Sequence, residues 1–262
     1  MHKGIYAGVS AMMVQQTTLD ATANNLANVD TAGFRARKAV AKSFPEVLME
    51  RIDPAKSQGE IPPWPWRSRP IGVASMNQVL SETYMSTEAG NMQVTDSQMD
   101  LALEDVSSFF VVMDGEGNQF YTRAGHFIVN QDGQIVTPDG HLLVGEGGPI
   151  EVGEVATVGF SDDGQVIADG EAVGQIQLVQ FETPTYLRQV GKNLLVETEE
   201  SGGPIPQENP QVTVGILERS NVSVVEEMVR MIEAQRSYEA ASKGVQTSDD
   251  MTGRLITSLG KV

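Results

Sequence analysis

The chain has 262 residues, 40% of them hydrophobic and 6% aromatic, and 18 Lys and Arg against 35 Asp and Glu give a formal net charge of −17. This composition is typical of a folded protein with a sizeable core. The negative charge repels phosphate backbones and anionic lipids, so we expect no nucleic-acid or membrane-surface partner. Cys is absent, which excludes disulfides, thiolate metal sites and Cys nucleophiles.

Residues 1–33 predict an amphipathic helix that ends in a turn. Its apolar positions recur at steps of seven residues, the period of helices that pair in coiled coils. These positions are Ile5, Met12, Leu19 and Leu26, with Val9, Gln16 and Ala23 interleaved. Polar residues 15–18 interrupt the apolar run before any cleavage-like site, and the period continues past them. We therefore expect no cleaved signal peptide.

Residues 34–80 predict an extended, Pro-rich linker, with at most a short helix before residue 53. The stretch 53–70 is dense in Pro and Gly, which disfavour both a central strand and a long helix. It also contains both Trp residues of the chain, Trp64 and Trp66. Two interpretations stay open for them: local packing, or an exposed aromatic contact for a neighbouring molecule.

Residues 81–214 predict a central antiparallel all-β domain. Short β-prone runs such as Phe109 to Met113 are separated by repeated Asp-Gly turns, which are strong hairpin signals. These turns are at Asp114-Gly115, Asp132-Gly133, Asp139-Gly140, Asp163-Gly164 and Asp169-Gly170. Many short strands joined this way are typical of a sandwich or a partly open barrel.

Residues 215–262 predict a second helix, which Ser223 and Glu226 would begin as a capping box. Its seven-residue seam consists of Val224, Met231, Tyr238, Val245, Thr252 and Leu259, with Met228, Gln235, Ser242, Asp249 and Ile256 interleaved. The predicted fold class is therefore α+β. The terminal helices would pair as a coiled-coil-like layer, with the β domain between them in sequence.

No pattern of polar residues indicates catalysis or cofactor binding. The three His residues are scattered, the Asp-Gly loops lack the first carboxylate of an EF-hand, and no glycine-rich phosphate loop opens a helix. We therefore expect no enzyme activity, metal, cofactor or small-molecule substrate. Glu104 and Asp105, just before a predicted strand, are the carboxylates left for an alternative peptidoglycan-cleaving activity.

Three blocks of sequence resemble, in the same order, the bacterial flagellar rod, hook and hook-associated proteins. They are Ala23 to Phe34, Tyr121 to Gly140, and Ser220 to Glu239. The length of the chain is similar to that of rod members of the family. The segment 44–70, between the first helix and the β domain, makes the chain most similar to the distal-rod member. That segment is unusual in its Pro and Trp content, and Glu104 to Ser108 replace a Gly-rich stretch, so a proximal-rod paralogue remains the alternative.

The resemblance implies a structural subunit of the basal body that polymerises into the hollow shaft crossing the periplasm. Such a subunit is exported by the flagellar type III apparatus and contacts copies of itself and other rod and hook proteins. In this family the terminal helices form an inner layer around the channel. Without that layer the helices lack a partner surface, so we expect disordered ends in the monomer.

We expect the assembly contacts to come from the two helices. The predicted residues are Ile5, Val9, Met12, Leu19, Asn24, Asn25, Leu26 and Asn28 in the first helix, and Val225, Met228, Val229, Met231, Ile232, Tyr238 and Val245 in the second. Asn is unfavourable inside a helix. The three Asn residues either mark a fraying end or bond neighbouring subunits through their amides, and we prefer the second interpretation.

Overall fold

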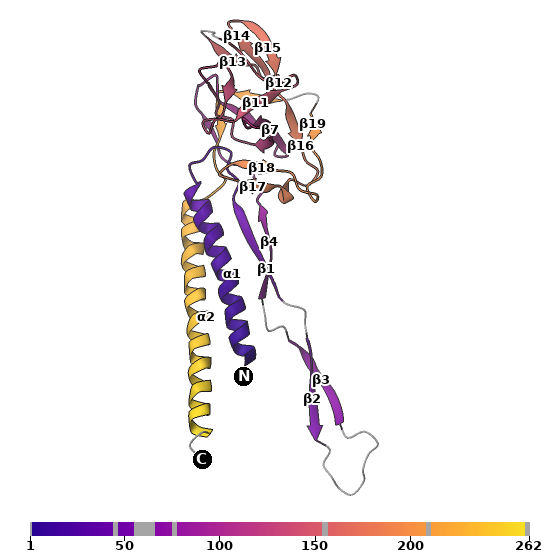
Figure 1. Cartoon of the computed structure of the whole chain (residues 1–262), viewed down its shortest axis with the longest axis vertical. Helices are drawn as coiled ribbons and strands as arrows, with labels where there is room; N and C mark the ends of the chain where they lie inside the picture. The colour runs from indigo at the N-terminus through magenta and orange to yellow at the C-terminus, as the bar shows by residue number, and fades with distance from the viewer. Residues whose placement is uncertain are drawn as a thin grey trace. The chain divides into compact units, whose positions relative to one another are not determined.

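The computed structural model describes residues 2–43, 47–54, 66–74, 78–153, 157–207 and 211–259. The chain divides into two units (Figure 1). The helical unit contains residues 1–20, 39–82 and 231–262, and the β unit contains residues 21–38 and 83–230. Helix α1 (His2–Ala27) and helix α2 (Val224–Leu259) each contribute residues to both units. No helix among the described residues is long and apolar enough to cross a membrane.

In the helical unit, α1 and α2 lie against each other with a close approach at Gly8. A Cβ at Gly8 would overlap Cγ2 of Val245 and would lie 3.6 Å from the carbonyl oxygen of Ala241. Gly4 faces the Ser248 hydroxyl in the same way, at 3.9 Å. Small residues on both helices therefore allow the two backbones to approach closely, and the expected pairing of the terminal helices is present.

The less exposed positions of α2 recur at the predicted seven-residue step, whereas the predicted interleaved positions are exposed, apart from Ser242. The seven-residue positions that are less exposed than their neighbours are Met231, Tyr238, Val245 and Thr252. Between them the less exposed residues are Ala234, Ala241, Ser242 and Ser248, whereas Met228 and Ile256 are 49% and 68% exposed. The same shift occurs in α1, where Val9, Gln16 and Ala23 are exposed. Small side chains suit the inner positions because the glycines of α1 bring the backbones close.

The segment predicted as a linker contains strands. Strand β1 (Arg37–Ser43) pairs with β4 (Gln78–Met85), and β2 (Val47–Pro54) pairs with β3 (Trp66–Ala74) in antiparallel register from Val47 opposite Ala74 to Pro54 opposite Trp66. The short helix expected before residue 53 is therefore wrong. Pro70 is accommodated because both strands of a two-stranded sheet are edges and because the register shifts beside its partner Glu50. Trp64 and the side chain of Trp66 lie outside the described residues.

The β unit is antiparallel, as predicted. Its main sheet has the order β17-β18-β8-β7-β11-β10-β9, with β12 on β11, and with β16 on β7 and β19. The bounds are β7 Ser108–Met113, β8 Gln119–Thr122, β9 Ile128–Val129, β10 Ile135–Val136, β11 Leu142–Gly145, β12 Gly148–Pro149, β16 Leu178–Gln180, β17 Arg188–Val190, β18 Leu194–Val196 and β19 Ile205–Pro206.

Three smaller sheets complete the β unit. They are formed by β13 (Val158–Phe160), β14 (Gln165–Ala168) and β15 (Glu171–Gln175); by β20 (Val212–Val214) with β6 (Leu101–Leu103); and by β21 (Ile216–Glu218) with β5 (Met92–Val94). A single 3₁₀ turn, Pro184–Tyr186, precedes β17 among the described residues. The last two sheets bring the strands before α2 onto strands from the middle of the chain.

Strand β7 is buried on both faces and divides the core of the β unit into two clusters. Phe110 and Val112 belong to the larger cluster, where the Phe110 ring meets that of Phe127 edge-on at 5.3 Å. Phe109 and Val111 belong to the smaller one, around Phe181. This alternation follows from the two-residue period of a strand, and burial on both faces explains why the run Phe109 to Met113 is continuously apolar.

Candidate functional site

Residues in or beside the three sequence blocks that resemble the flagellar family meet at one junction in the β unit. The turn after α1 reaches this junction at Gly33, whose φ is +66° and whose amide donates a hydrogen bond to the Glu218 carbonyl at 2.8 Å. A Cβ at Gly33 would overlap the backbone of Arg123 and Ala124. Glycine is therefore required twice, for its left-handed backbone and for the close approach.

A buried ion cluster of Arg35, Arg123 and Glu218 lies at the same junction: Arg123 is inside the second block, Arg35 directly follows the first, and Glu218 is two residues before the third. The Glu218 carboxylate, with its side chain 1% exposed, lies 2.8 Å from Nη2 of Arg35 and 2.8 Å from Nε of Arg123. It also accepts the amide of Gly90 at 2.9 Å. Arg123 donates further to the carbonyl oxygens of Leu103, Asp105, Val106 and Ser108. One carboxylate thus joins segments more than 180 residues apart in the sequence.

The ion cluster is electrostatically demanding because it holds two cations against one anion. Burial lowers the pKa of Arg35 to about 10; the Glu218 carboxylate opposes this shift, and Arg123 adds to it. Removing one member of such a buried group leaves uncompensated charge and typically costs about 3–5 kcal/mol. The cluster is therefore a structural lock whose integrity depends on Glu218.

Asn25 forms a second connection at the junction, with hydrogen-bond partners in the same chain. Its side chain is buried, with Oδ1 accepting the Arg37 amide at 2.8 Å and Nδ2 donating to the Arg37 carbonyl at 2.9 Å. Nδ2 also donates to Oε2 of Glu227 at 3.2 Å, and Arg230 donates to the other oxygen of Glu227. The amide therefore joins α1, β1 and α2 within one chain, and a contact of Asn25 with another subunit stays a prediction.

Asn28 is also bonded locally. Its Nδ2 donates to the Asn24 carbonyl at 2.9 Å, and its Oδ1 accepts from the Thr31 hydroxyl at 3.3 Å, so it stabilises the turn after α1. The side chain of Asn24 is exposed, and its contact with another subunit stays a prediction. The sequence alone could not distinguish hydrogen bonds within the chain from hydrogen bonds to another subunit, because it shows that an Asn side chain needs a partner but not where that partner lies.

Four junction residues were absent from the predicted set: Arg35, Arg123, Glu218 and Asn221. Asn221 accepts the Ala36 amide at 2.8 Å and donates to the Glu88 carbonyl at 2.9 Å. Arg123 and Asn221 lie inside the blocks that resemble the flagellar family, and this position could have marked them as candidate site residues. Arg35 directly follows a block, and no local pattern marks Glu218 as buried.

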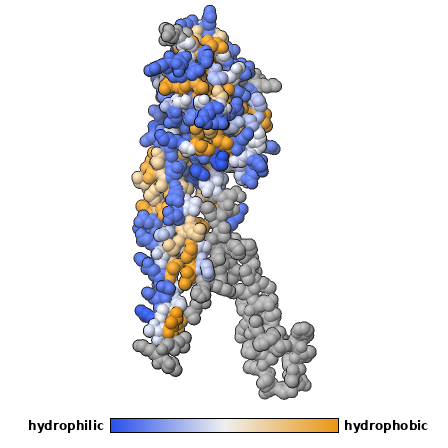
Figure 2. All heavy atoms as spheres, viewed as in Figure 1, coloured by the Kyte–Doolittle hydropathy of each residue, from blue (hydrophilic) through white to orange (hydrophobic). Residues whose placement is uncertain are grey.

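The predicted assembly residues of the helices divide into two groups. Those that are half-buried in the single chain are Ile5, Met12, Leu19, Leu26, Met231, Tyr238 and Val245. Those that are exposed are Val9, Val225, Met228, Val229 and Ile232, and the further apolar residues Tyr6, Met13, Met251 and Ile256 are exposed with them. Figure 2 shows apolar side chains on the surface of the helices. The helices therefore present large apolar side chains that the described part of the chain does not cover.

Nothing in the described part of the chain forms a recognisable catalytic centre. It contains no group of three or more His, Asp or Glu placed to hold a metal ion. Nδ1 of His126 contacts Asp100 at 2.5 Å across two paired backbone segments. A hydrogen bond from the Ser107 amide lowers the pKa of Asp105, whereas a glycosidase acid requires a raised one. This favours a structural role for Asp105.

Comparison with known proteins gives matches along the chain. Residues 5–35 match the family model described as "Flagella basal body rod protein", residues 106–168 match "Flagellar hook protein FlgE/F/G D1 domain", and residues 213–258 match "Flagellar basal body rod FlgEFG protein C-terminal". Each of the three segments contributes a member of the junction.

Full-length relatives agree with these matches. The flagellar basal-body rod protein FlgG of Caulobacter vibrioides is 35% identical, covering 95% of this chain and 96% of the relative. FlgG of Bacillus subtilis is 34% identical, covering 98% of each chain. The flagellar basal-body rod protein FlgF of Caulobacter vibrioides is 29% identical over the whole of both chains.

Proposed function

The chain belongs to the flagellar basal-body rod protein family, and we propose that it is a structural subunit of the rod, polymerising through its two helices into a hollow shaft. The observation that carries the proposal is the exposed apolar row on α2. Val225, Val229 and Ile232 are 72%, 50% and 52% exposed and recur at steps of four and three, so they share one face of the helix.

Two faces of α2 would then have different roles. The face containing Met231 and Val245 is covered in part by α1 of the same chain, whereas the row of Val225, Val229 and Ile232 would meet the helices of neighbouring subunits. Burying three such side chains contributes about 1.5–3 kcal/mol each before the entropy of association is subtracted. In a shaft, every subunit makes this contact with several neighbours, so a modest free energy per contact is enough to hold the assembly together.

Within the family we place the chain at the distal-rod position. In the same bacterium, Caulobacter vibrioides, the FlgG relative is 35% identical and the FlgF relative 29% identical. Homopolymer formation, contacts with other rod and hook proteins, export by the type III apparatus without signal-peptide cleavage, and passage through the periplasm follow from this placement as parts of the proposal.

The deciding experiment combines gene deletion with complementation. We expect basal bodies of the deletion strain, imaged by electron microscopy, to have truncated rods and no hooks. A chain with Val229→Glu and Ile232→Glu would leave the rods truncated. The control Gln235→Glu and Gln246→Glu, which adds the same charge at exposed positions of α2 outside the row, would restore full rods. Complete rods in the deletion strain would refute the function, whereas full rods with the Val229 and Ile232 variant would refute the assembly face.

The peptidoglycan-cleaving alternative has its own test. Purified chain incubated with peptidoglycan at pH values from 4 to 8 is expected to release no sugar fragments, because hydrogen bonds from Ser107 lower the pKa of Asp105, whereas a general acid needs a raised one. Release that is abolished by Glu104→Gln would establish the enzyme instead.

A further inference from the structure

In the part of the β unit after residue 82, the cations that form no ion pair among the described residues lie close together in the sequence. After residue 82 this unit has five Lys and Arg against 24 Asp and Glu. Three of the five cations, Arg123, Arg219 and Arg230, are held in ion pairs with carboxylates. Among the described residues of this stretch, the other two, Arg188 and Lys192, are exposed and take part in no ion pair. Arg188 begins strand β17, and Lys192 follows its end.

Strand β17 is also a free edge of the main sheet. Its one neighbour in the sheet order is β18, so its outer side presents unpaired backbone groups. Val190 and Tyr186 add apolar surface there, since they are 39% and 43% exposed. We call Tyr186 to Lys192 the β17 edge. It combines two cations, apolar side chains and free backbone hydrogen-bonding groups, which together form a surface suited to an acidic and partly apolar partner.

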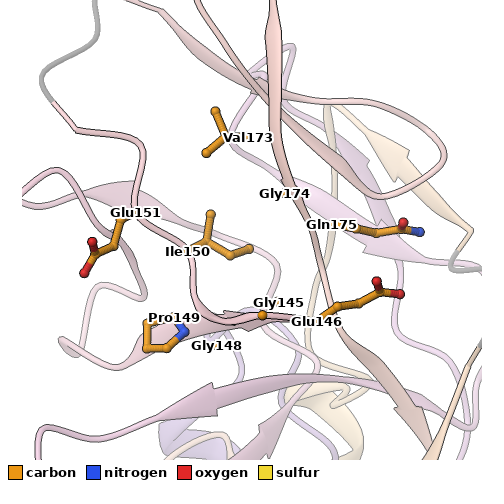
Figure 3. A pocket seen from close by; sticks show the side chains of 10 residues that line it. Gly145, Glu146, Gly148, Pro149, Ile150, Glu151, Val173, Gly174 and Gln175 are labelled. Atoms are coloured by element: carbon orange, nitrogen blue, oxygen red, sulfur yellow. The ribbon is translucent and has the colours of Figure 1, made fainter.

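An open hollow elsewhere in the β unit has the complementary character. It is lined by residues 145–151 around the β11–β12 turn and by residues 173–175 of β15 (Figure 3). Glu146 and Glu151 supply negative charge, and Val173, 46% exposed, supplies apolar surface. Glu151 accepts a hydrogen bond from Gln134 at 3.0 Å, whereas Glu146 has no ion-pair partner among the described residues. We call this surface the acidic hollow.

These two surfaces cannot meet within one chain. Strands β18, β8 and β7 separate β17 from β11, so the two surfaces are about four strand spacings, or roughly 19 Å, apart. Contact between them therefore requires two copies. Because the contacting surfaces differ, the interaction is head-to-tail and repeats along an open helical assembly without closing on itself.

We propose that the β17 edge of one copy docks into the acidic hollow of a second copy, with Arg188 and Lys192 facing Glu146 and Glu151 and with Val190 against Val173. The proposal rests on the proposed function, because it assumes that copies polymerise. Strongly acidic β units repel one another at most orientations. Two cations at one edge favour a single orientation, so the contact sets how neighbouring β units are placed.

Engineered cysteines test the contact directly, because the natural chain has none to react in the background. Basal bodies from cells carrying Lys192→Cys with Glu146→Cys are treated with a short bismaleimide and separated on a denaturing gel. We expect a ladder of dimers, trimers and larger species. Each single substitution, and the comparison pair Lys192→Cys with Gln119→Cys on the exposed start of β8, would give at most a trace of dimer.

The outcomes separate this contact from the proposed function. Rods that contain the variant chain but give no more cross-linking than the comparison pair would overturn the contact and leave the function standing. Absence of the unsubstituted chain from purified basal bodies would overturn both.

Charge variants provide the second measurement. Lys192→Glu is expected to impair rod completion at least severalfold, and adding Glu146→Lys in the same chain to restore it. The control Gln119→Glu with Gln131→Glu adds the same negative charge at exposed positions and is expected to leave rod completion unchanged. If the control impairs rods as strongly, or if Glu146→Lys restores nothing, the effect is one of net charge and the specific contact is refuted.

Discussion

The two units of the chain differ most in their charge. The β unit contains eight Lys and Arg against 25 Asp and Glu, a net charge of −17, whereas the helical unit contains ten of each and is neutral. Large apolar side chains are exposed on both helices. A neutral, apolar surface allows copies to approach closely, and an acidic β unit keeps the free subunit soluble. The exposed apolar helix surfaces, of which Val225 and Val229 lie in the β unit, would thus serve the proposed polymerisation, and the acidic remainder of the β unit would favour solubility.

The units also differ in what stabilises them. The β unit has two apolar clusters and a buried ion cluster with partners inside the same chain. The described helices have a close approach at Gly8, but much of their apolar surface has no partner among the residues that the structure describes. We therefore expect the β unit, including the junction around Asn25 and Glu218, to be ordered before assembly. The helix segments beyond it would become protected from protease in the assembled rod.

The largest expected effect is the loss of the buried carboxylate. Glu218→Gln leaves two buried guanidinium groups without an anion, so we expect the free energy of unfolding of the β unit to fall by about 3–5 kcal/mol. Urea unfolding followed by the fluorescence of a dye-labelled β unit or by circular dichroism measures this change. Glu116→Gln, in an exposed turn, is the matched control and should change stability by less than about 0.5 kcal/mol. Equal effects of the two substitutions would mean that the junction is not a lock.

Gly33→Ala probes the same junction through the backbone. The new Cβ meets the Arg123–Ala124 backbone in addition to the strain of a φ of +66°, so we expect a loss of about 2–4 kcal/mol. Gly202→Ala separates the two causes, because Gly202 has a φ of +77° with nothing near its Cβ. That control is expected to cost only about 1 kcal/mol. A larger loss at Gly202 than at Gly33 would contradict the close approach.

Gly8→Ala tests the helical unit, and its effect should appear in assembly more than in stability. Alanine raises intrinsic helix stability by about 1 kcal/mol, but the added methyl group overlaps Val245 and forces the helices apart. We expect unchanged unfolding of the β unit and fewer completed rods. Gly244→Ala, in an open position of α2, gives the propensity gain without the overlap. It should raise helix content by circular dichroism and leave rods intact.

The sequence predicted those features that depend on near neighbours. The Asp-Gly turns located the hairpins because a turn is set by a few adjacent residues, and the seven-residue period located the helices. Contacts between residues far apart in the sequence could not be predicted. Neither the burial of Glu218 between Arg35 and Arg123 nor the hydrogen bond of Asn25 to Glu227 leaves a local sequence pattern. The interleaved seam positions failed for the same reason, since small residues such as Ala241 become inner positions only opposite the glycines of α1.

The smallest effect concerns the pH dependence of the β unit. Hydrogen bonds from the amide and hydroxyl of Ser107 lower the pKa of Asp105 below its ordinary value of 3.8, and Gln180 donates to the same carboxylate at 2.6 Å. Because the folded pKa is the lower one, the stabilisation is complete above about pH 4 and is lost as the pH falls through the folded value.

Asp105 is exposed, so solvent screening keeps the contribution below about 0.5 kcal/mol. Asp105→Asn should therefore leave stability at pH 7 slightly reduced and make the acid limb between pH 4 and 2 flatter. Asp132→Asn, at another exposed turn, is the control. An unchanged acid limb would assign the acid sensitivity of the β unit to other carboxylates, and the comparison of the two units would then rest on their net charge and their buried contacts.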